Sequence, residues 1–551
     1  MKVLIISGTE STFDEDEFYS FLRKAYNKFI TRLRKCISRR LDFSVMPTIS
    51  MEKDFLRGRG GERTITPALT GPLLGGVLYE NGIDYDMATG FFLDSQEGQE
   101  RIQHILQSKK YDVIGISTTF ITTNTLLQHL INIVKRVQPN CKIVVGGHLL
   151  FGNDAVYLLE GIDYYVIGDG ENAFPELIKA IDNNVLDPNI KGVMRSDYIV
   201  PSLITSSTEI DLNDLPLPAW DKYLKGLNSN QRDYVSKKII FPIQIETTRG
   251  CAYRCSYCNY WANYRRVRFK SAEKIIQEMI LLYELGVRKM GFWDSSFTTP
   301  KNRLIKLIEL IEKQIFHDVE LSGFAMIKDL DIDLLTRMEK VGFNLLYFGI
   351  ESGNDGILKK MRRNHSVKDV IDFFYDFNNS GLQIEILGSF IIGFPGETID
   401  SISDSINLIK QTRLKYANIQ QLWIKQGSDI HSHPENYGLS YDTQENLRYS
   451  FSWKHETMNS SDAARIATDV FYRIHFETSA LLLEPLYCLT DLSHLFSPIN
   501  NERNFSFLRL IQEGIAISLK ELPDYDTLLD LICNRIVNDF PDKALYILKN
   551  H

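Results

Sequence analysis

Short apolar runs alternate with helical segments twice along this 551-residue chain, and this alternation limits the possible folds more than any other feature. In the first stretch the apolar runs are strand-like, and the segments between them carry apolar residues at helical spacing. This pattern is typical of a parallel sheet covered by helices on both faces. We therefore predict a doubly wound, Rossmann-like domain over residues 1–184. The expected strands are 2–7, 83–88, 111–117, 141–147 and 162–168, and the expected helices are 70–81, 97–107, 122–137 and 171–183.

The alternation restarts with a longer period over residues 241–430. In a helix expected at 271–285, for example, Ile275, Met279 and Leu282 fall on one face. Six strand-helix units predict a partial (β/α)6 barrel of the TIM type, with functional residues at the carboxyl ends of its strands. The chain is thus expected to be an α/β protein. The expected barrel strands are 241–246, 289–293, 320–325, 344–350, 383–392 and 418–424.

Two further segments lie outside the alternating regions. Residues 185–240 contain several prolines and a serine and threonine run, so we interpret them as a linker between the two domains. Residues 431–551 show helical spacing without recurrent strands, especially at 460–483 and 504–549. We expect a helical carboxyl-terminal domain there, and we expect it to contact the substrate.

Residues 8–69 do not fit the first alternating pattern. Lysines and arginines between Arg23 and Arg40 are interspersed with apolar positions, which predicts an amphipathic helix with a solvated basic face. The glycine-rich segment at 57–62 predicts a loop. In the last domain, single histidines and aromatic residues on helices are expected to be packing residues. These are Trp453, His455, His475 and Phe476.

Composition excludes several classes of function. The 62 lysines and arginines are outnumbered by 70 aspartates and glutamates, and the net charge of -8 disfavours nucleic acid as a partner. No apolar run is long enough to insert into a membrane, and the apolar start is too short for a signal peptide. We therefore expect a cytoplasmic protein whose scattered cysteines stay reduced. These are Cys36, Cys141, Cys488 and Cys533.

The other three of the seven cysteines gather in one stretch, where residues 245–258 read I-E-T-T-R-G-C-A-Y-R-C-S-Y-C. Thiolates are soft ligands suited to zinc and to iron-sulfur clusters. Structural zinc normally takes four protein ligands, and no second cysteine pair follows. We therefore predict that Cys251, Cys255 and Cys258 hold a four-iron cluster and leave one iron open.

This cysteine stretch, with Tyr257 before its last cysteine, resembles the signature of the radical S-adenosylmethionine (SAM) enzymes. Three later segments resemble the SAM-contacting segments of that family: G-F-W-D-S-S-F at 291–297, L-Y-F-G-I-E-S-G at 346–353 and F-I-I-G-F-P-G-E at 390–397. The resemblance implies a 4Fe-4S cluster and SAM as cofactors. The implied SAM-contacting residues are Tyr257, Asp294, Ser295, Glu351, Ser352, Ile392 and Gly393.

The first domain, taken with the barrel, resembles the cobalamin-binding domain of the cobalamin-dependent radical SAM superfamily. The resemblance includes V-V-G-G-H at 144–148 and V-I-G-D-G-E at 166–171. Ligands of such sheets bind outside the carboxyl ends of the strands, where glycines let the backbone approach closely. Residues 1–200 lack the D-x-H-x-x-G segment that supplies a histidine to cobalt, so His148 is expected to lie near the corrin without ligating it. The expected cobalamin contacts are Ser117, Thr118, Gly146, Gly147, His148, Gly168, Gly170 and Glu171.

The resemblance implies a methyltransferase that cleaves SAM reductively and, with cobalamin, methylates a carbon centre of a small-molecule or peptide substrate. An external donor of the flavodoxin or ferredoxin type would supply electrons. Three alternatives stay open: a cyclase or ring-rearranging enzyme, a non-radical cobalamin methyltransferase, and a protein whose first domain docks a substrate without cobalamin. A zinc-stapled binding protein is a further and less favoured alternative.

Overall fold

The computed structural model describes most of the chain. The described residues are 1–9, 17–40, 69–93, 96–119, 121, 123–150, 154–185, 189–197, 209–226, 242–261, 264, 266–292, 294–295, 297–314, 316–442, 449–482, 502–520, 525–540 and 543–544. The glycine-rich segment predicted as a loop at 57–62 lies outside them, as do Cys488 and part of the predicted linker.

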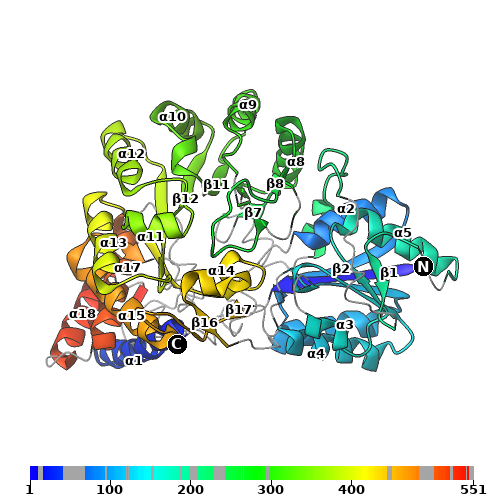
Figure 1. Ribbon diagram of the computed structural model, residues 1–551, viewed down its shortest axis with the longest axis horizontal. Helices are drawn as coiled ribbons and strands as arrows, with labels where there is room; N and C mark the ends of the chain where they lie inside the picture. The colour runs from blue at the N-terminus through cyan, green and yellow to red at the C-terminus, as the bar shows by residue number, and fades with distance from the viewer. Residues whose placement is uncertain are drawn as a thin grey trace.

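The first domain is a doubly wound sheet, as predicted, with strand order β2-β1-β3-β4-β5-β6. Helices α2 and α5 cover one face and helices α3 and α4 cover the other (Figure 1). Its strands are β1 (Lys2–Thr9), β2 (Asp84–Phe92), β3 (Val113–Ser117), β4 (Lys142–Gly146), β5 (Tyr164–Val166) and β6 (Val193–Arg195). Its helices are α2 (Thr70–Glu80), α3 (Gln96–Ser108), α4 (Asn124–Val137) and α5 (Gly170–Asp182).

The sixth strand corrects the prediction of five strands. Strand β6 pairs antiparallel with β5, with Tyr165 opposite Met194, whereas the other neighbours in this sheet are parallel. Its three residues lie in the segment predicted as linker. Three residues are too few to show a strand-like alternation in the sequence. The position of β6 is determined instead by its pairing with the edge strand β5.

The barrel domain is built on a seven-stranded parallel sheet with strand order β19-β14-β13-β12-β11-β10-β7. Figure 1 shows its helices as an arc outside the strands. The strands are β7 (Ile243–Gln244), β10 (Lys289–Phe292), β11 (Glu320–Ala325), β12 (Phe343–Glu351), β13 (Glu385–Ile392), β14 (Tyr416–Gln421) and β19 (Leu481–Leu482). The helices are α8 (Ala272–Glu284), α9 (Lys301–Glu312), α10 (Ile332–Lys340), α11 (Asp355–Lys360), α12 (Val367–Ser380) and α13 (Ile399–Gln411).

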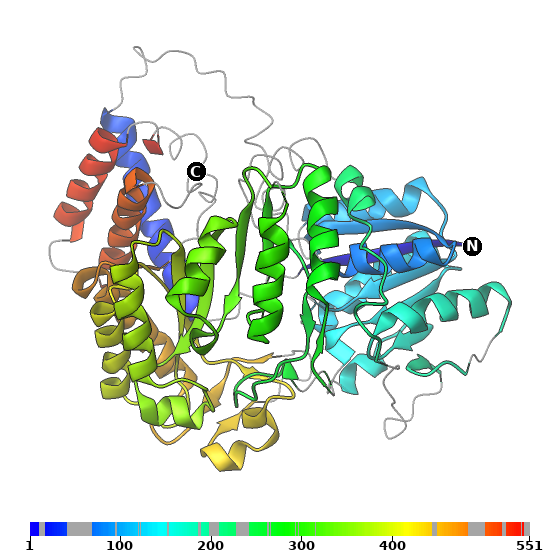
Figure 2. The same ribbon diagram turned by 90° about the horizontal axis from the view of Figure 1, so that it is seen from above.

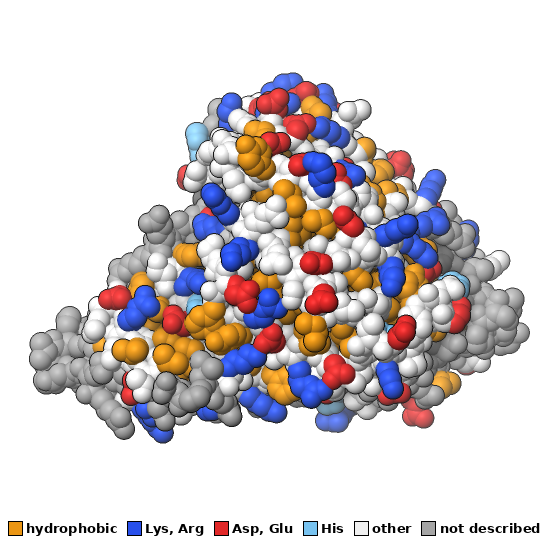
Figure 3. All heavy atoms as spheres, turned by 60° about the vertical axis from the view of Figure 1, so that its left-hand side comes forward, with side chains coloured by type: hydrophobic (Ala, Val, Ile, Leu, Met, Phe, Trp, Pro, Cys, Tyr) orange, Lys and Arg blue, Asp and Glu red, His pale blue; other side chains and the backbone are white. Residues whose placement is uncertain are grey.

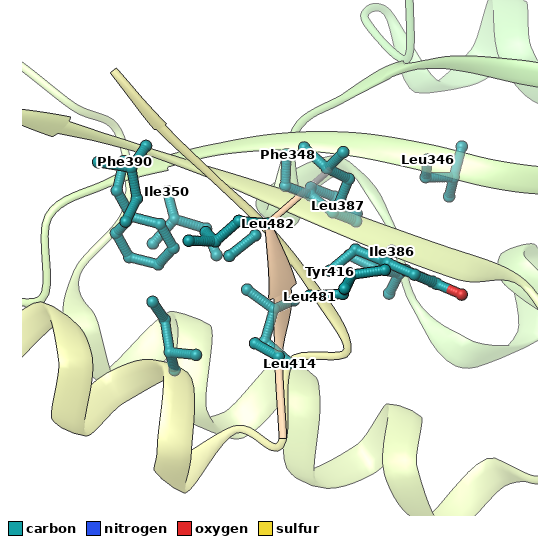
Figure 4. Packing of buried hydrophobic residues seen from close by; sticks show 14 of the residues in the cluster. Leu346, Phe348, Ile350, Ile386, Leu387, Phe390, Leu414, Tyr416, Leu481 and Leu482 are labelled. Carbon is teal, nitrogen blue, oxygen red and sulfur yellow. The ribbon is translucent and has the colours of Figure 1, made fainter. Parts of the chain in front are cut away.

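The seventh strand, β19, comes from the carboxyl-terminal region and pairs in parallel with β14. Its Leu481 and Leu482 are fully buried beside Tyr416 and Leu387, as Figure 4 shows. This strand again corrects the prediction, because residues 460–483 were expected to be helical to their end. The helix α15 (Ser460–Glu477) stops at Thr478, and the two leucines after it complete the barrel sheet.

The helix predicted from the basic segment exists as α1 (Glu17–Arg40), but it does not pack on the first domain. It lies beside α15, α17 (Glu502–Lys520) and α18 (Tyr525–Asp539) at the far end of the molecule from α2 to α5, as Figures 1 and 2 both show. Phe29 is fully buried, and a Cβ at Gly514 would approach its ring to 2.2 Å. The predicted domain at 1–184 therefore contains a helix that belongs spatially to the carboxyl-terminal domain.

The carboxyl-terminal domain is helical in its bulk but also carries small β-bridged pieces below the barrel (Figure 1). These are β15 (Ile424–Lys425) with β17 (Tyr449–Ser450), and β16 (Ser440–Tyr441) with β18 (Trp453–Lys454); the short helix α14 (Asp429–Ser432) lies among them. On the face in Figure 3, basic and acidic side chains intermingle. Within the described ranges, no helix has the length and apolar content that crossing a membrane requires.

Candidate functional site

A cavity of about 530 Å³ lies between the first domain and the barrel. From the first domain it is lined by the carboxyl ends of β3, β4 and β5 and by the start of α2. From the barrel it is lined by the cysteine segment, by Asp294 after β10 and by Lys425 on β15. The ends of two parallel sheets, where ligands bind in such folds, therefore open into one space.

The three predicted cluster ligands lie on a closed loop rather than on a free strand end. Strand β8 (Thr248–Arg249) pairs antiparallel with β9 (Arg268–Phe269), so the cysteine segment starts from a paired base. Gly250 turns the chain into the loop with a φ of 84°, and a Cβ there would meet the Arg266 carbonyl oxygen at 2.9 Å. Only glycine adopts this conformation without strain.

The surroundings of the thiols suit an anionic iron-sulfur group. Arg363 donates from Nη1 to the Cys255 Sγ at 3.2 Å, and the Tyr260 amide donates to the Cys258 Sγ at 3.5 Å. Donors of this kind stabilise sulfur that carries negative charge. Burial raises the pKa of the Cys251 and Cys258 thiols, so these two sulfurs favour the neutral form until a metal replaces the proton.

Among the residues that the structure describes, no three histidine, cysteine, aspartate or glutamate side chains converge as ligands of a single metal ion. A four-iron cluster takes each thiolate on a different iron, so its ligands need not meet at one point. The three thiols with their sulfur-directed donors fit such a cluster by the chemistry of the donor set.

Tyr257 and Glu351, both predicted to contact SAM, lie together around Arg363. The guanidinium Nη1 lies 3.4 Å from the Tyr257 hydroxyl, and Nη2 donates to the Gly349 carbonyl oxygen. Glu351 ends β12 with a φ of 72°, an unusual conformation for a residue with a side chain, and burial raises the pKa of its carboxyl. The neighbouring Ser352 is fully buried, and its Oγ accepts the Asn354 amide at 3.2 Å. Strained residues of this kind cluster at functional sites.

Asp294 faces the cavity and is held rigidly. Its Oδ2 accepts hydrogen bonds from the Thr247 amide at 2.7 Å and from the Thr247 hydroxyl. Burial raises the pKa of Asp294 to about 7, because the charged form loses its solvation. Ser295 instead turns to the cysteine loop, where its Oγ donates to the Gly250 carbonyl oxygen at 3.2 Å. The structure thus brings both predicted residues to the loop, but only Asp294 lines the cavity.

Ile392 ends β13 and Gly393 follows it, and residues of the carboxyl-terminal domain support this segment. His455 lies 3.0 Å from the Gly393 carbonyl oxygen through Nε2, and its ring stacks on Trp453. A Cβ at Gly393 would approach the Trp453 ring to 2.5 Å, so the turn requires glycine. Trp453 and His455 are buried packing residues, as predicted, but Trp453 lies on strand β18 and His455 follows that strand, so neither lies on a helix.

The predicted cobalamin contacts form a glycine-rich rim with an apolar floor. Gly147 has a φ of 109°, and a Cβ there would meet the Thr119 amide nitrogen at 2.8 Å. Leu69, Leu73 and Leu74 at the start of α2 line the floor. A glycine-rich rim beside apolar residues leaves room for a large flat ligand such as a corrin. The cavity lining includes Ser117, Gly146, Gly147, His148, Gly168, Gly170 and Glu171, whereas Thr118 is buried behind the rim with its hydroxyl on the Gly146 carbonyl oxygen at 2.9 Å.

His148 reaches across the cavity to the cysteine loop. Its Nε2 lies 3.3 Å from the Tyr264 hydroxyl, and the two rings meet edge to face. Glu171 also crosses, because its carboxylate pairs with Arg249 of the barrel domain. The sequence prediction missed Arg249, Tyr264 and Arg363. For Arg249, its place just before the first cysteine was the available signal.

Two known families match the chain, one in each of the two domains that line the cavity. Residues 66–178 match the B12 binding domain family, and residues 245–409 match the radical SAM superfamily. These two ranges supply most of the residues that line the cavity.

Similar proteins include several methyltransferases. An uncharacterised methyltransferase of Pyrococcus horikoshii is 28% identical over 57% of this chain and 68% of its own length. The cytidylyl-2-hydroxyethylphosphonate methyltransferase of Streptomyces wedmorensis is 24% identical over 56% of this chain and 63% of its own length. The radical SAM methyltransferase TsrM of Kitasatospora setae, with cobalamin and a [4Fe-4S] cluster bound, superposes with a TM-score of 0.61 at 15% identity and covers 83% of this chain and 96% of its own. This last likeness shows a shared fold.

Proposed function

The chain belongs to the cobalamin-dependent radical SAM superfamily, since it joins a B12-binding domain to a radical SAM domain, and from this premise we propose that it methylates a carbon centre of a small-molecule or peptide substrate. Its cofactors are a 4Fe-4S cluster, SAM and cobalamin. The observation that carries the proposal is that both domains line one and the same cavity. A methyl group can pass between two cofactors and a substrate only if all three share one space.

When bound, the cluster supplies the electron that cleaves SAM, and cobalamin supplies the carrier for the methyl group. Cys251, Cys255 and Cys258 would hold the cluster, and Arg363 would hold negative charge at its sulfurs. The residues that would hold SAM are Tyr257, Asp294, Ser295, Glu351, Ser352, Ile392 and Gly393. The residues that would hold cobalamin are Ser117, Gly146, Gly147, His148, Gly168, Gly170 and Glu171, with Thr118 supporting the rim from behind. Closing this cavity with substrate would exclude water from the reacting groups.

Two of these residues have defined tasks in the proposal. Buried Asp294, with a pKa of about 7, can accept a hydrogen bond from an ammonium group or carry a proton near neutral pH. Glu351 can accept two hydroxyl groups of a ribose through its two oxygens. The carboxyl-terminal domain would then close the barrel around the substrate, with Trp453 and His455 fixing the turn at Gly393.

The products of SAM test this function. The protein is reconstituted without oxygen with iron, sulfide and hydroxocobalamin, and incubated with a reductant of the flavodoxin or ferredoxin type, SAM and a library of metabolites and peptides. Radical methylation predicts S-adenosylhomocysteine and 5'-deoxyadenosine in about equal amounts with each methylated product. Formation of 5'-deoxyadenosine alone would instead indicate a cyclase or rearranging enzyme, and S-adenosylhomocysteine alone a polar methyltransferase.

A further inference from the structure

Arg249 connects the cluster loop to the opposite domain through buried ion pairs. It lies two residues before Cys251 at the base of the loop, and its side chain is 7% exposed. Its Nη1 donates to Asp169 Oδ1 at 3.0 Å, its Nη2 donates to the Glu171 carboxylate, and its Nε donates to Glu246 Oε1 at 2.8 Å. Asp169 and Glu171 belong to the first domain, whereas Glu246 follows β7 of the barrel.

A second arginine of the same hairpin holds the same turn. Arg268 is the register partner of Arg249 in the pairing of β9 with β8, and its side chain is 6% exposed. It donates to both oxygens of Asp169 and to the Ile210 carbonyl oxygen at 3.0 Å. The Ile210 amide in turn donates to Asp169 at 3.1 Å. Two arginines of one hairpin in the barrel domain therefore both form ion pairs with Asp169 of the first domain.

The turn at residues 168–171, which contains Asp169 and Glu171, is part of the rim that would face cobalamin in the proposed function. Asp169 and Glu171 alternate with Gly168 and Gly170, which line the cavity between β5 and α5. Buried charges are tolerated only when they are paired, and here two guanidinium groups pair with three carboxylates, two from the first domain and one from the barrel domain. The forked guanidinium can serve three carboxylates at once, which a lysine ammonium cannot do with fixed geometry.

We propose that Arg249 is a positioning residue, and that its ion pairs with Asp169 and Glu171 fix the cluster loop against the rim turn and so set the separation of the two cofactors. This inference rests on the proposed function for the identity of the cofactors. The ion pairs of Arg249 with Asp169 and Glu171 are observed whatever the cofactors are. The ion pairs then transmit any displacement of the rim to the loop two residues before Cys251.

The separation of the cofactors can be measured by pulsed electron paramagnetic resonance, because cob(II)alamin and the reduced cluster are both paramagnetic. The native holoenzyme should give one narrow distance. Arg249→Gln should keep both cofactors but broaden the distance distribution, and Arg249→Lys should restore part of the narrowing. The control Arg337→Gln removes an exposed ion pair with Glu312 inside the barrel domain and should leave the distribution unchanged. An unchanged distance in Arg249→Gln with both cofactors bound would overturn the inference.

Hydrogen exchange tests the contact without cobalamin. In Arg249→Gln, amides of the rim turn at 166–174 should exchange about tenfold faster, although the substitution lies in the other domain. A residue that only supports its own loop would speed exchange at 245–258 and leave 166–174 unchanged, and this result would contradict the inference. If the native protein retains no corrinoid, the proposed function fails, while faster exchange at 166–174 would still support the interdomain contact.

Discussion

At the scale of single residues, Arg363 connects a predicted cluster ligand with a predicted SAM-contacting residue, although it was not itself predicted from the sequence. It contacts the sulfur of Cys255 and the hydroxyl of Tyr257, although it lies 108 and 106 residues further along the chain. Burial opposes its charge, but Tyr257, Glu351 and Cys255 around it keep the pKa of the guanidinium raised. A fixed positive charge therefore stands beside the cluster ligands at every working pH.

Replacing Arg363 with alanine should slow SAM cleavage. The loss of one preorganised charged donor typically slows a reaction on the order of 10²-fold. We expect a decrease of that size in 5'-deoxyadenosine formation with excess dithionite, measured by chromatography after normalisation to cluster content. Arg362→Ala is the matched control, because Arg362 pairs with Asp429 outside the cavity. A native rate in Arg363→Ala would show that Arg363 does not act on the cluster or on SAM.

The buried carboxyl of Glu397 should make the stability of the protein depend on pH. Burial raises the pKa of its carboxyl to about 8 from an ordinary value of 4.5, while the Gly393 amide donates to Oε2 at 2.7 Å. The unfolded chain releases this proton near pH 4.5 and the folded chain holds it to about pH 8. Stability must therefore fall as pH rises through this window, by up to about 1.4 kcal/mol per pH unit.

Glu397→Gln should remove that dependence, because a neutral amide can keep the acceptor for Gly393. Relative to the native protein, its free energy of unfolding should rise by up to about 1.4 kcal/mol per unit between about pH 5 and 8, measured by urea denaturation. The exposed Glu435→Gln is the control and should leave the slope unchanged. Parallel curves for Glu397→Gln and the native protein would refute the argument.

At the scale of elements, α1 ties the beginning of the chain to its end. Its apolar face packs against α15, α17 and α18, and Arg32 pairs with Asp530 at 3.3 Å. The helix therefore stabilises a domain whose other helices follow more than 400 residues later.

Truncation of Phe29 should destabilise this carboxyl-terminal bundle. Phe29→Ala leaves a cavity where the ring meets Gly514, and such substitutions cost about 3–5 kcal/mol. We expect a lower midpoint of thermal unfolding and faster exchange of amides in α17. Asn27→Ala changes an exposed position of the same helix and should stay within about 0.5 kcal/mol of the native protein. Equal midpoints for the two variants would show that α1 does not support the bundle.

The helices and long strands could be predicted from the sequence because their periodicity is local. Strand β11 was predicted at its observed bounds, and α8 within one residue at each end. Strands β6 and β19 were missed because two or three residues carry no period, and their place depends on a neighbouring edge. The packing of α1 and the contacts of Arg249 were missed for the same reason, since partners far apart in sequence determine them.

At the scale of the whole molecule, one cavity joins two domains whose ligand-binding edges face each other. The domains are held by buried charges at Arg249 and Arg268, which cannot separate without exposing unpaired carboxylates. The carboxyl-terminal domain extends the barrel sheet with β19 at the β14 edge, and its Trp453 packs against the turn at Gly393. Contacts between the three domains therefore fix their positions around the proposed cofactor sites.

In the proposed function, the protein moves a methyl group from SAM by way of cobalamin. The most direct test supplies the reconstituted protein with hydroxocobalamin, a reductant and SAM deuterated at its methyl group, and analyses the corrinoid fraction by mass spectrometry. We expect about one retained corrinoid per chain, carrying the deuterium label, and release of S-adenosylhomocysteine. A protein that binds its cluster and SAM but retains no corrinoid, or retains one that stays unlabelled, would contradict the proposed methyl transfer through cobalamin.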